Sequence, residues 1–200
     1  MDYTTLALVK QAMDSKETVQ DTVLSSFITR ASRYLDKLCT SQSNVANYFM
    51  TETVNAEILT NGVIDFAGRL AVFPHKPVIT AVSAIAYRYS LRQNWIDGDP
   101  LMTALLQDMV VFEGYLPSWD QGYVKISYTG GLGLTVTDLP EDLVDLATTM
   151  TIRLYKEART GLGDSIGVAE LGMLVYTKAF PQRVLDMLNV ANYARIAPWT

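Results

Sequence analysis

Apolar residues recur at helical spacing in the first part of the chain. They follow one another every three or four positions from Val23 to Leu38, and polar side chains occupy most of the opposite face. Asp21 stands where a capping residue is expected for this stretch. A shorter stretch with the same spacing covers residues 4–13. The pattern predicts two helices within residues 1–42, of which the second is the longer.

The last part of the chain returns to the helical pattern. Asp138-Leu139-Pro140-Glu141 combines a capping Asp, a Pro that the first helical turn tolerates, and a Glu three residues after the cap. Apolar residues at helical spacing follow this signal, and a weaker helical stretch covers residues 165–175. Pro181 opens a further amphipathic stretch. We therefore expect residues 138–195 to be helical and residues 196–200 to form a short tail.

The middle third has a different pattern, because apolar and polar residues tend to alternate there with the period of a β-strand. Asn61-Gly62 is the strongest short-range turn signal in the chain. The stretch 78–87 is apolar on both alternating sets apart from Thr80 and Ser83, so we expect it to lie centrally in its sheet. Strands are predicted over residues 49–59, 69–73, 78–89, 109–112 and 123–128.

The order of these elements predicts the α+β class. We expect a mainly helical framework of about four to five helices, with a small antiparallel β-sheet insertion in the middle third. The chain has 200 residues, of which 49% are hydrophobic, and this is enough apolar material for a core. We expect one domain over residues 1–200, with helical parts at 1–42 and 138–195 and a β-rich insertion at 45–130.

The balance of acidic and basic residues disfavours some classes of function. The chain has 16 basic and 21 acidic residues, a net charge of −5 and a pI of about 4.8. An acidic chain has no counterion-release attraction to DNA or RNA, so nucleic-acid binding is disfavoured as its main activity. No apolar run is long enough to span a membrane, and the N-terminus lacks the features of a signal peptide. We expect no membrane association, and a place in a cytoplasm or in a particle assembled there.

Residues that could carry chemistry are few. His75 is the only histidine and Cys39 the only cysteine, so neither a zinc site nor a His-based catalytic set has the residues it needs. We expect His75 to be exposed in a turn and Cys39 to be a buried, inert thiol. The acids at 97–99 and 138–145 lie in a turn and at a helix start, where solvated carboxylates are ordinary. We expect no catalytic residue, cofactor or metal, although a carboxylate-only magnesium or calcium site stays open.

Glycines and aromatic residues are further candidates for a functional site. Gly130-Gly131-Leu132-Gly133 follows a predicted strand but lacks the Lys-Ser/Thr ending of a phosphate loop, and no helix follows it directly, so turn glycines are expected. Tyr, Trp and Arg side chains suit a protein interface as well as a platform for stacked bases. Given the net charge, we favour core and interface for the aromatic residues that crowd the predicted sheet with Arg88 and Arg92, namely Tyr87, Tyr89, Trp95, Tyr115, Trp119, Tyr123 and Tyr128.

Four stretches span most of the chain in a characteristic order. They are the run from Ala31 to Cys39, the strand from Pro77 to Val82, the run from Val124 to Gly131 leading into Asp138–Leu143, and the segment from Gly167 to Glu170 followed by the helix at Pro181. In this order and spacing the chain resembles the head–tail connector (adaptor, or head-completion) proteins of tailed bacteriophages. The stretch 89–119 departs from that family because it is longer than the family's usual hairpin.

The resemblance implies a structural role in a virion assembled in the cytoplasm of the bacterial host. Family members form a homo-oligomeric ring of about a dozen copies beneath the portal protein. The ring extends the channel for double-stranded DNA and offers a docking face to the next neck or tail protein. The C-terminal region of such proteins tends to engage the portal, and by position this implies a portal or partner interface at Arg183, Tyr193, Arg195, Trp199 and Thr200.

Other functions remain open from the sequence. Another neck or tail completion protein, such as a tail terminator, belongs to the same broad class. A small carboxylate-dependent enzyme would need a polar cleft where Asp and Glu side chains converge. A nucleic-acid module would need an aromatic face flanked by Arg88, Arg92 and Lys125.

Overall fold

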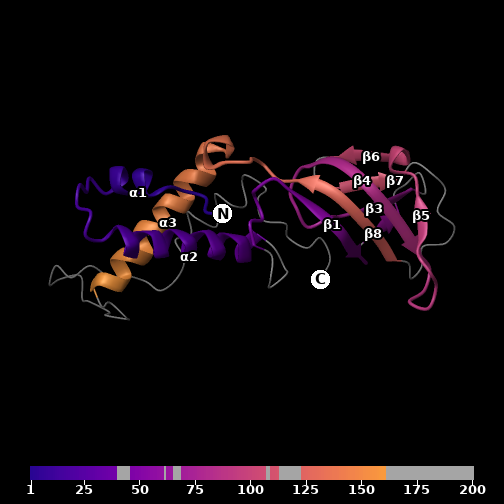
Figure 1. Ribbon diagram of the computed structural model, residues 1–200, viewed down its shortest axis with the longest axis horizontal. Coiled ribbons are helices and arrows are strands. Elements are labelled where there is room, and N and C mark those ends of the chain that lie inside the picture. Colours follow the sequence, from indigo (N-terminus) through magenta and orange to yellow (C-terminus); the bar gives the residue numbers. More distant parts are fainter. Residues whose placement is uncertain (40–45, 61, 65–68, 107–108, 113–122, 161–200) are drawn as a thin grey trace, which may run out of the picture. The chain divides into compact units, whose positions relative to one another are not determined.

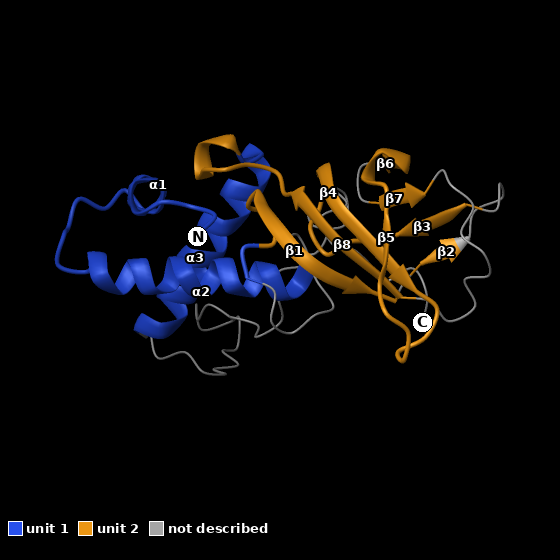
Figure 2. Ribbon diagram, turned by 45° about the vertical axis from the view of Figure 1, so that its right-hand side comes forward, with its two compact units in different colours: residues 1–47, 139–200 blue, residues 48–138 orange. Residues whose placement is uncertain are grey.

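The structure is a computed structural model that describes residues 1–39, 46–60, 62–64, 69–106, 109–112 and 123–160. The chain divides into two compact units (Figure 2). Unit 1 comprises Met1–Asn47 and Leu139–Thr200, and unit 2 comprises Tyr48–Asp138. Unit 2 is therefore an insertion between the second and third helices of unit 1.

Unit 1 is helical in its described residues. Its helices are α1 (Leu6–Ala12), α2 (Asp21–Cys39) and α3 (Glu141–Thr160) (Figure 1). Thr5 caps α1, because its side chain accepts a hydrogen bond from the backbone N–H of Leu8. Most of the apolar stripe predicted for α2 is buried, at Leu24, Phe27, Ile28, Ala31 and Leu35, but Val23 and Tyr34 are exposed. No helix in the described part of the chain has the length and apolar character needed to cross a membrane.

The core of unit 1 joins all three helices. Phe27 of α2 meets Tyr155 of α3 edge to face, with ring centroids 6.0 Å apart. The buried members of this cluster are Val9, Leu24, Phe27, Ile28 and Tyr155. The N-terminal residues are also fixed here, because Tyr3 is fully buried and its backbone N–H donates to Oγ of Ser32 over 3.0 Å.

Unit 2 contains two antiparallel four-stranded sheets within its described residues. One has the strand order β1-β8-β4-β5 and the other the order β2-β3-β7-β6. The strands are β1 (Glu52–Leu59), β2 (Val63–Ile64), β3 (Leu70–Val72), β4 (Ile79–Arg88), β5 (Ile96–Gly98), β6 (Thr103–Leu106), β7 (Met109–Phe112) and β8 (Tyr123–Gly130), with a 3₁₀ turn η1 (Pro100–Met102) before β6 and a second, η2 (Val136–Asp138), after β8.

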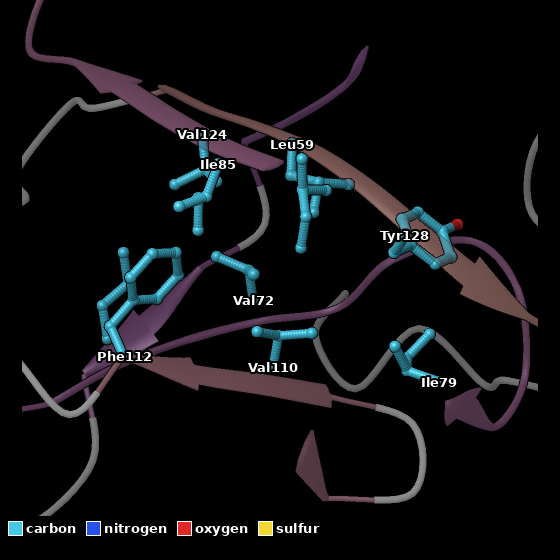
Figure 3. Packing of buried hydrophobic residues seen from close by; sticks show 10 residues of the cluster. Leu59, Val72, Ile79, Ile85, Val110, Phe112, Val124 and Tyr128 are labelled. Carbon is cyan, nitrogen blue, oxygen red and sulfur yellow. The ribbon is translucent and has the colours of Figure 1, made fainter. Parts of the chain in front are cut away.

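Both sheets contribute to one hydrophobic core, which Figure 3 shows from close by. Val124, Ile126 and Tyr128 point into it from β8 and are fully buried. Val72 of β3 and Val110 of β7 reach the same core from the other sheet. A strand that is buried on one face only alternates buried and half-exposed residues, and β8 does so along its whole length.

The strand predictions are confirmed for β1, β3, β4, β7 and β8, and β4 lies inside its sheet as expected. The predicted framework of about four to five helices is not matched, because the described residues contain three α-helices and two sheets. The helices predicted at 165–175 and from Pro181 lie outside the described residues. The stretch 89–119 supplies β5, η1, β6 and β7, so it builds part of both sheets. The single domain over residues 1–200 stays a prediction.

Candidate interaction surface

The β1-β8-β4-β5 sheet carries a group of long side chains at one end of its outer face, the face away from the core. Tyr123 and Lys125 alternate with the buried residues of β8 and are half-exposed. Arg88 is the cross-strand partner of Tyr123, and Ala86 is that of Lys125. Directly opposed residues in an antiparallel pair share a face, so Arg88, Tyr123 and Lys125 lie together on the side away from the core.

Trp95, just before β5, completes this group. The guanidinium carbon of Arg88 lies 4.3 Å from the centroid of the Trp95 ring and 5.2 Å from that of Tyr123. Nζ of Lys125 lies 4.8 Å from the Trp95 centroid. Two cations therefore stack on one indole, and each such contact is worth about 0.5–2 kcal/mol depending on solvent exposure. We call Arg88, Trp95, Tyr123 and Lys125 the cationic–aromatic cluster.

The two cations of this cluster contact aromatic rings. No carboxylate of the described residues pairs with them. No Asp or Glu in the described part of the chain lies within ion-pair distance of Arg88 or Lys125. Nε of Arg88 is buried without a hydrogen-bond acceptor, and Nη1 makes one long contact of 3.5 Å to the carbonyl of Leu91. Within the described residues, most donors of this guanidinium have no protein acceptor.

Exposed apolar side chains gather in the neighbouring part of the sequence, around β5, η1 and β6. Leu101 is 89% exposed and Leu91 65% exposed. Ile96, Met102, Leu105 and Leu106 are exposed as well. Contact with another protein is one use of such exposed apolar side chains.

A contrasting surface lies at the start of α3 in unit 1. Glu141, Asp142 and Asp145 are exposed and fall on one side of the helix. The partial positive charge of the helix N-terminus stabilises these acids without a bound ion. No group of three or more His, Cys, Asp or Glu residues that could hold a metal is present in the described ranges.

Asp138 does not act as the cap that the sequence suggested for this helix. Its carboxylate accepts hydrogen bonds from the backbone N–H and the hydroxyl of Thr135, at 2.9 and 2.8 Å. These bonds favour the charged form and lower the pKa of Asp138. The first turn of α3 closes instead on the carbonyl of Pro140, which accepts from the N–H groups of Leu143 and Val144.

A partly buried polar network ties the loop before β4 to the β1-β8-β4-β5 sheet. Glu57 accepts hydrogen bonds from the hydroxyl of Tyr128 and the backbone N–H of His75, and its carboxylate pairs with the His75 ring. Nζ of Lys76 pairs with Glu52 at 2.7 Å and donates to the carbonyl of Met50. His75 was expected to be an exposed turn residue, but its side chain is only 23% exposed, because this network holds it against β1.

The prediction that Cys39 is a buried thiol is confirmed. The residue ends α2 and is 1% exposed. Burial, and then the nearby carboxylate of Asp36, raise the pKa of the Cys39 thiol to about 12. The thiolate is therefore scarce at neutral pH, and the group is a poor nucleophile in the folded chain.

The predicted site residues Arg183, Tyr193, Arg195, Trp199 and Thr200 all lie outside the described residues. The aromatic residues divide: Tyr128 is in the core, Trp95 and Tyr123 join the cationic–aromatic cluster, and Tyr115 and Trp119 lie outside the described ranges. The network around Glu57 could not be predicted from the sequence, since no spacing rule links residues 57, 75 and 128.

No protein-family model and no curated protein matches the chain. Among solved structures, the chain is similar to one in the neck of an empty GTA particle, computed with C6 symmetry; the identity is 14%, the TM-score 0.52, and the likeness covers 92% of this chain and 87% of that one. It is also similar to a chain in the virion of a native gene transfer agent (GTA) particle, at 14% identity and a TM-score of 0.46, over 87% of this chain and 78% of that one. At 14% identity, the first likeness shows a shared fold.

Proposed function

We propose that this chain is a structural protein in the neck of a phage-like virion. The observation that carries the proposal is the fold shared with a chain of the GTA particle neck over 92% of this sequence. The order of the four sequence stretches supports the same class by an independent route, because it does not depend on the coordinates. In this role the chain acts by assembly, not as an enzyme, and binds no cofactor.

The finer role within the neck follows from the resemblance to head–tail connector proteins. The chain forms a ring of about a dozen copies beneath the portal protein, extends the DNA channel, and presents a face to the next neck or tail component. A ring needs two different faces on each subunit, one for each neighbour. The cationic–aromatic cluster, the exposed apolar side chains near β5 and the acidic start of α3 are surfaces of different character on one chain.

The portal contact is assigned to the C-terminal region, at Arg183, Tyr193, Arg195, Trp199 and Thr200. Tryptophan and arginine are the side chains that most often dominate binding energy at protein interfaces. Replacing Arg195 and Trp199 together with Ala should therefore weaken portal binding while the chain keeps its fold and its contacts with other copies.

Purification of the chain alone and together with the portal protein of the same particle tests the proposal. Mass measurement of the native assembly and electron microscopy should show a closed ring, or a complex with the portal. A protein that stays monomeric at all concentrations and does not bind the portal would contradict the neck role. Binding to a tail tube end in place of the portal would identify a tail terminator.

A further inference from the structure

The cationic–aromatic cluster has the composition of a docking site for carboxylates. Arg88 and Lys125 are held by the rings of Trp95 and Tyr123 at 4.3–5.2 Å, so their charges are positioned without a carboxylate partner among the described residues. A positioned guanidinium loses little freedom when it binds a carboxylate. Arg, Trp and Tyr are also the residues enriched where binding energy concentrates.

The chain itself carries a matching acidic surface. Glu141 and Asp145 are one helical turn apart at the start of α3 and exposed, and no cation in the described part of the chain lies within ion-pair distance of either. Asp142 is exposed beside them. In a chain with a net charge of −5, the cationic–aromatic cluster and this acidic surface are complementary in sign.

We infer that the cationic–aromatic cluster of one copy docks on the acidic start of α3 of a neighbouring copy. This inference rests on the proposed function, because a ring is closed by contacts between two different faces of identical subunits. The exposed side chain of Leu91, whose carbonyl contacts Arg88, supplies apolar area beside the charged contact. Because the contact includes half-exposed charges, added salt weakens it.

Paired charge reversals test this contact. One variant carries Arg88→Glu and Lys125→Glu, and the other carries Glu141→Lys and Asp145→Lys. Each variant then presents two surfaces of the same sign, so assembly measured by native mass spectrometry and sedimentation should need at least about tenfold more protein. A control matched to the first variant, Lys16→Glu with Lys37→Glu, makes the same change in net charge at two exposed positions and should assemble as the original chain does.

Mixing the two reversed variants in equal amounts gives the decisive result. In an alternating ring every interface again joins opposite charges, so the mixture should assemble although neither variant does alone. If the mixture fails while the chain carrying all four substitutions assembles, the contact lies within one chain and the inference is wrong. If the reversed variants assemble normally, the inference is overturned but the neck role stands. If the original chain never assembles and does not bind the portal, both the inference and the neck role are contradicted.

DNA binding by the cluster, and misfolding of a variant, would each give a different result. Loss of binding to short duplex DNA in the Arg88→Glu, Lys125→Glu variant, with unchanged assembly, would mean that the cluster faces DNA and would overturn the inference. Circular dichroism confirms that each variant is folded. If Arg88→Glu disturbs the fold, the single reversals Lys125→Glu and Asp145→Lys repeat the mixing experiment with Arg88 intact, and the same rescue is expected.

Discussion

Gly131 has a backbone conformation that favours glycine. Its φ is 133°, a region that side chains rarely tolerate. A Cβ placed there would lie 2.5 Å from the carbonyl group of Met50 and from Cα of Thr51. The chain passes so closely because Gly131 donates to the carbonyl of Pro77 over 2.8 Å and Leu132 donates to that of Phe49 over 2.7 Å. Gly131 thus joins three segments that are distant in sequence.

Replacing Gly131 with Ala should destabilise the protein by more than about 2 kcal/mol, because backbone strain and a backbone clash add together. Urea denaturation measures the change. Leu134→Ala is the control, since Leu134 is 65% exposed, and it should change the free energy of unfolding by less than about 0.5 kcal/mol. Equal effects of the two changes would contradict the close approach at Gly131.

The Cys39 thiol makes stability depend on pH in the alkaline range. Its pKa in the folded chain is about 12 against an ordinary value of 9.0. Folding therefore favours the protonated form, and the contribution of the thiol is complete below its ordinary pKa and is lost as pH rises toward about 12. A Cys39→Ala variant should show a weaker loss of stability across this range.

Thiol reactivity checks the same property directly. At about pH 8 the folded chain should react with a disulfide reagent far more slowly than the chain in denaturant, because the thiolate is scarce and buried. Rapid, complete labelling of the folded chain under these conditions would show that α2 opens at its end or that Cys39 is accessible.

At the level of elements, β8 organises unit 2. It lies between β1 and β4, and its inward residues fill the core. The hydroxyl of Tyr128 lies at the edge of that core, where it donates to Glu57 of β1 and accepts from the backbone N–H of Lys76. One side chain thereby links two strands and the loop before β4, and this satisfies buried polar groups that would otherwise cost free energy.

Tyr128→Phe keeps the ring but removes the hydroxyl, so it should destabilise the chain by about 1–3 kcal/mol, the cost of leaving a buried carboxylate short of a donor. Tyr123→Phe on the same strand is the matched control, because the Tyr123 hydroxyl makes no hydrogen bond within the described residues, and its effect should stay within about 0.5 kcal/mol. Thermal unfolding of both variants at one pH distinguishes them.

Elements with regular apolar patterns could be predicted, whereas β5 could not. The stripe of α2 and the alternation of β8 follow from local spacing. Residues 93–100, with Asp97-Gly98-Asp99-Pro100, indicated a turn or loop, yet Ile96–Gly98 forms β5. The hydrogen bonds that make it a strand come from β4, through pairs such as Tyr87 with Ile96. Such pairing depends on a partner that propensity does not describe.

At the level of the whole molecule, each unit has a hydrophobic cluster of its own. Leu24 is buried in the cluster of unit 1, and Ile126 is fully buried in that of unit 2. The clusters are built from different segments. Unit 1 combines the N-terminal and C-terminal parts of the chain, whereas unit 2 is one continuous segment. Local opening follows such cooperative units.

Leu24→Ala and Ile126→Ala should each lower the free energy of unfolding by about 2–5 kcal/mol. Hydrogen exchange read by mass spectrometry should rise mainly in the helical residues for the first variant and mainly in Tyr48–Asp138 for the second. Ile96→Ala is the control, because Ile96 is 44% exposed, and it should leave exchange nearly unchanged. A uniform rise across the chain for either core variant would contradict separate clusters.

The amino-acid sequence by itself determined the α+β class, five of the strands, the long helices α2 and α3, and the buried thiol, because each depends on local spacing or composition. Only the tertiary structure decided that the middle third forms two sheets, that His75 and Tyr128 meet at Glu57, and that Arg88 and Lys125 both contact the ring of Trp95. These features join residues far apart in the chain, and such contacts are set by the packing of the complete core.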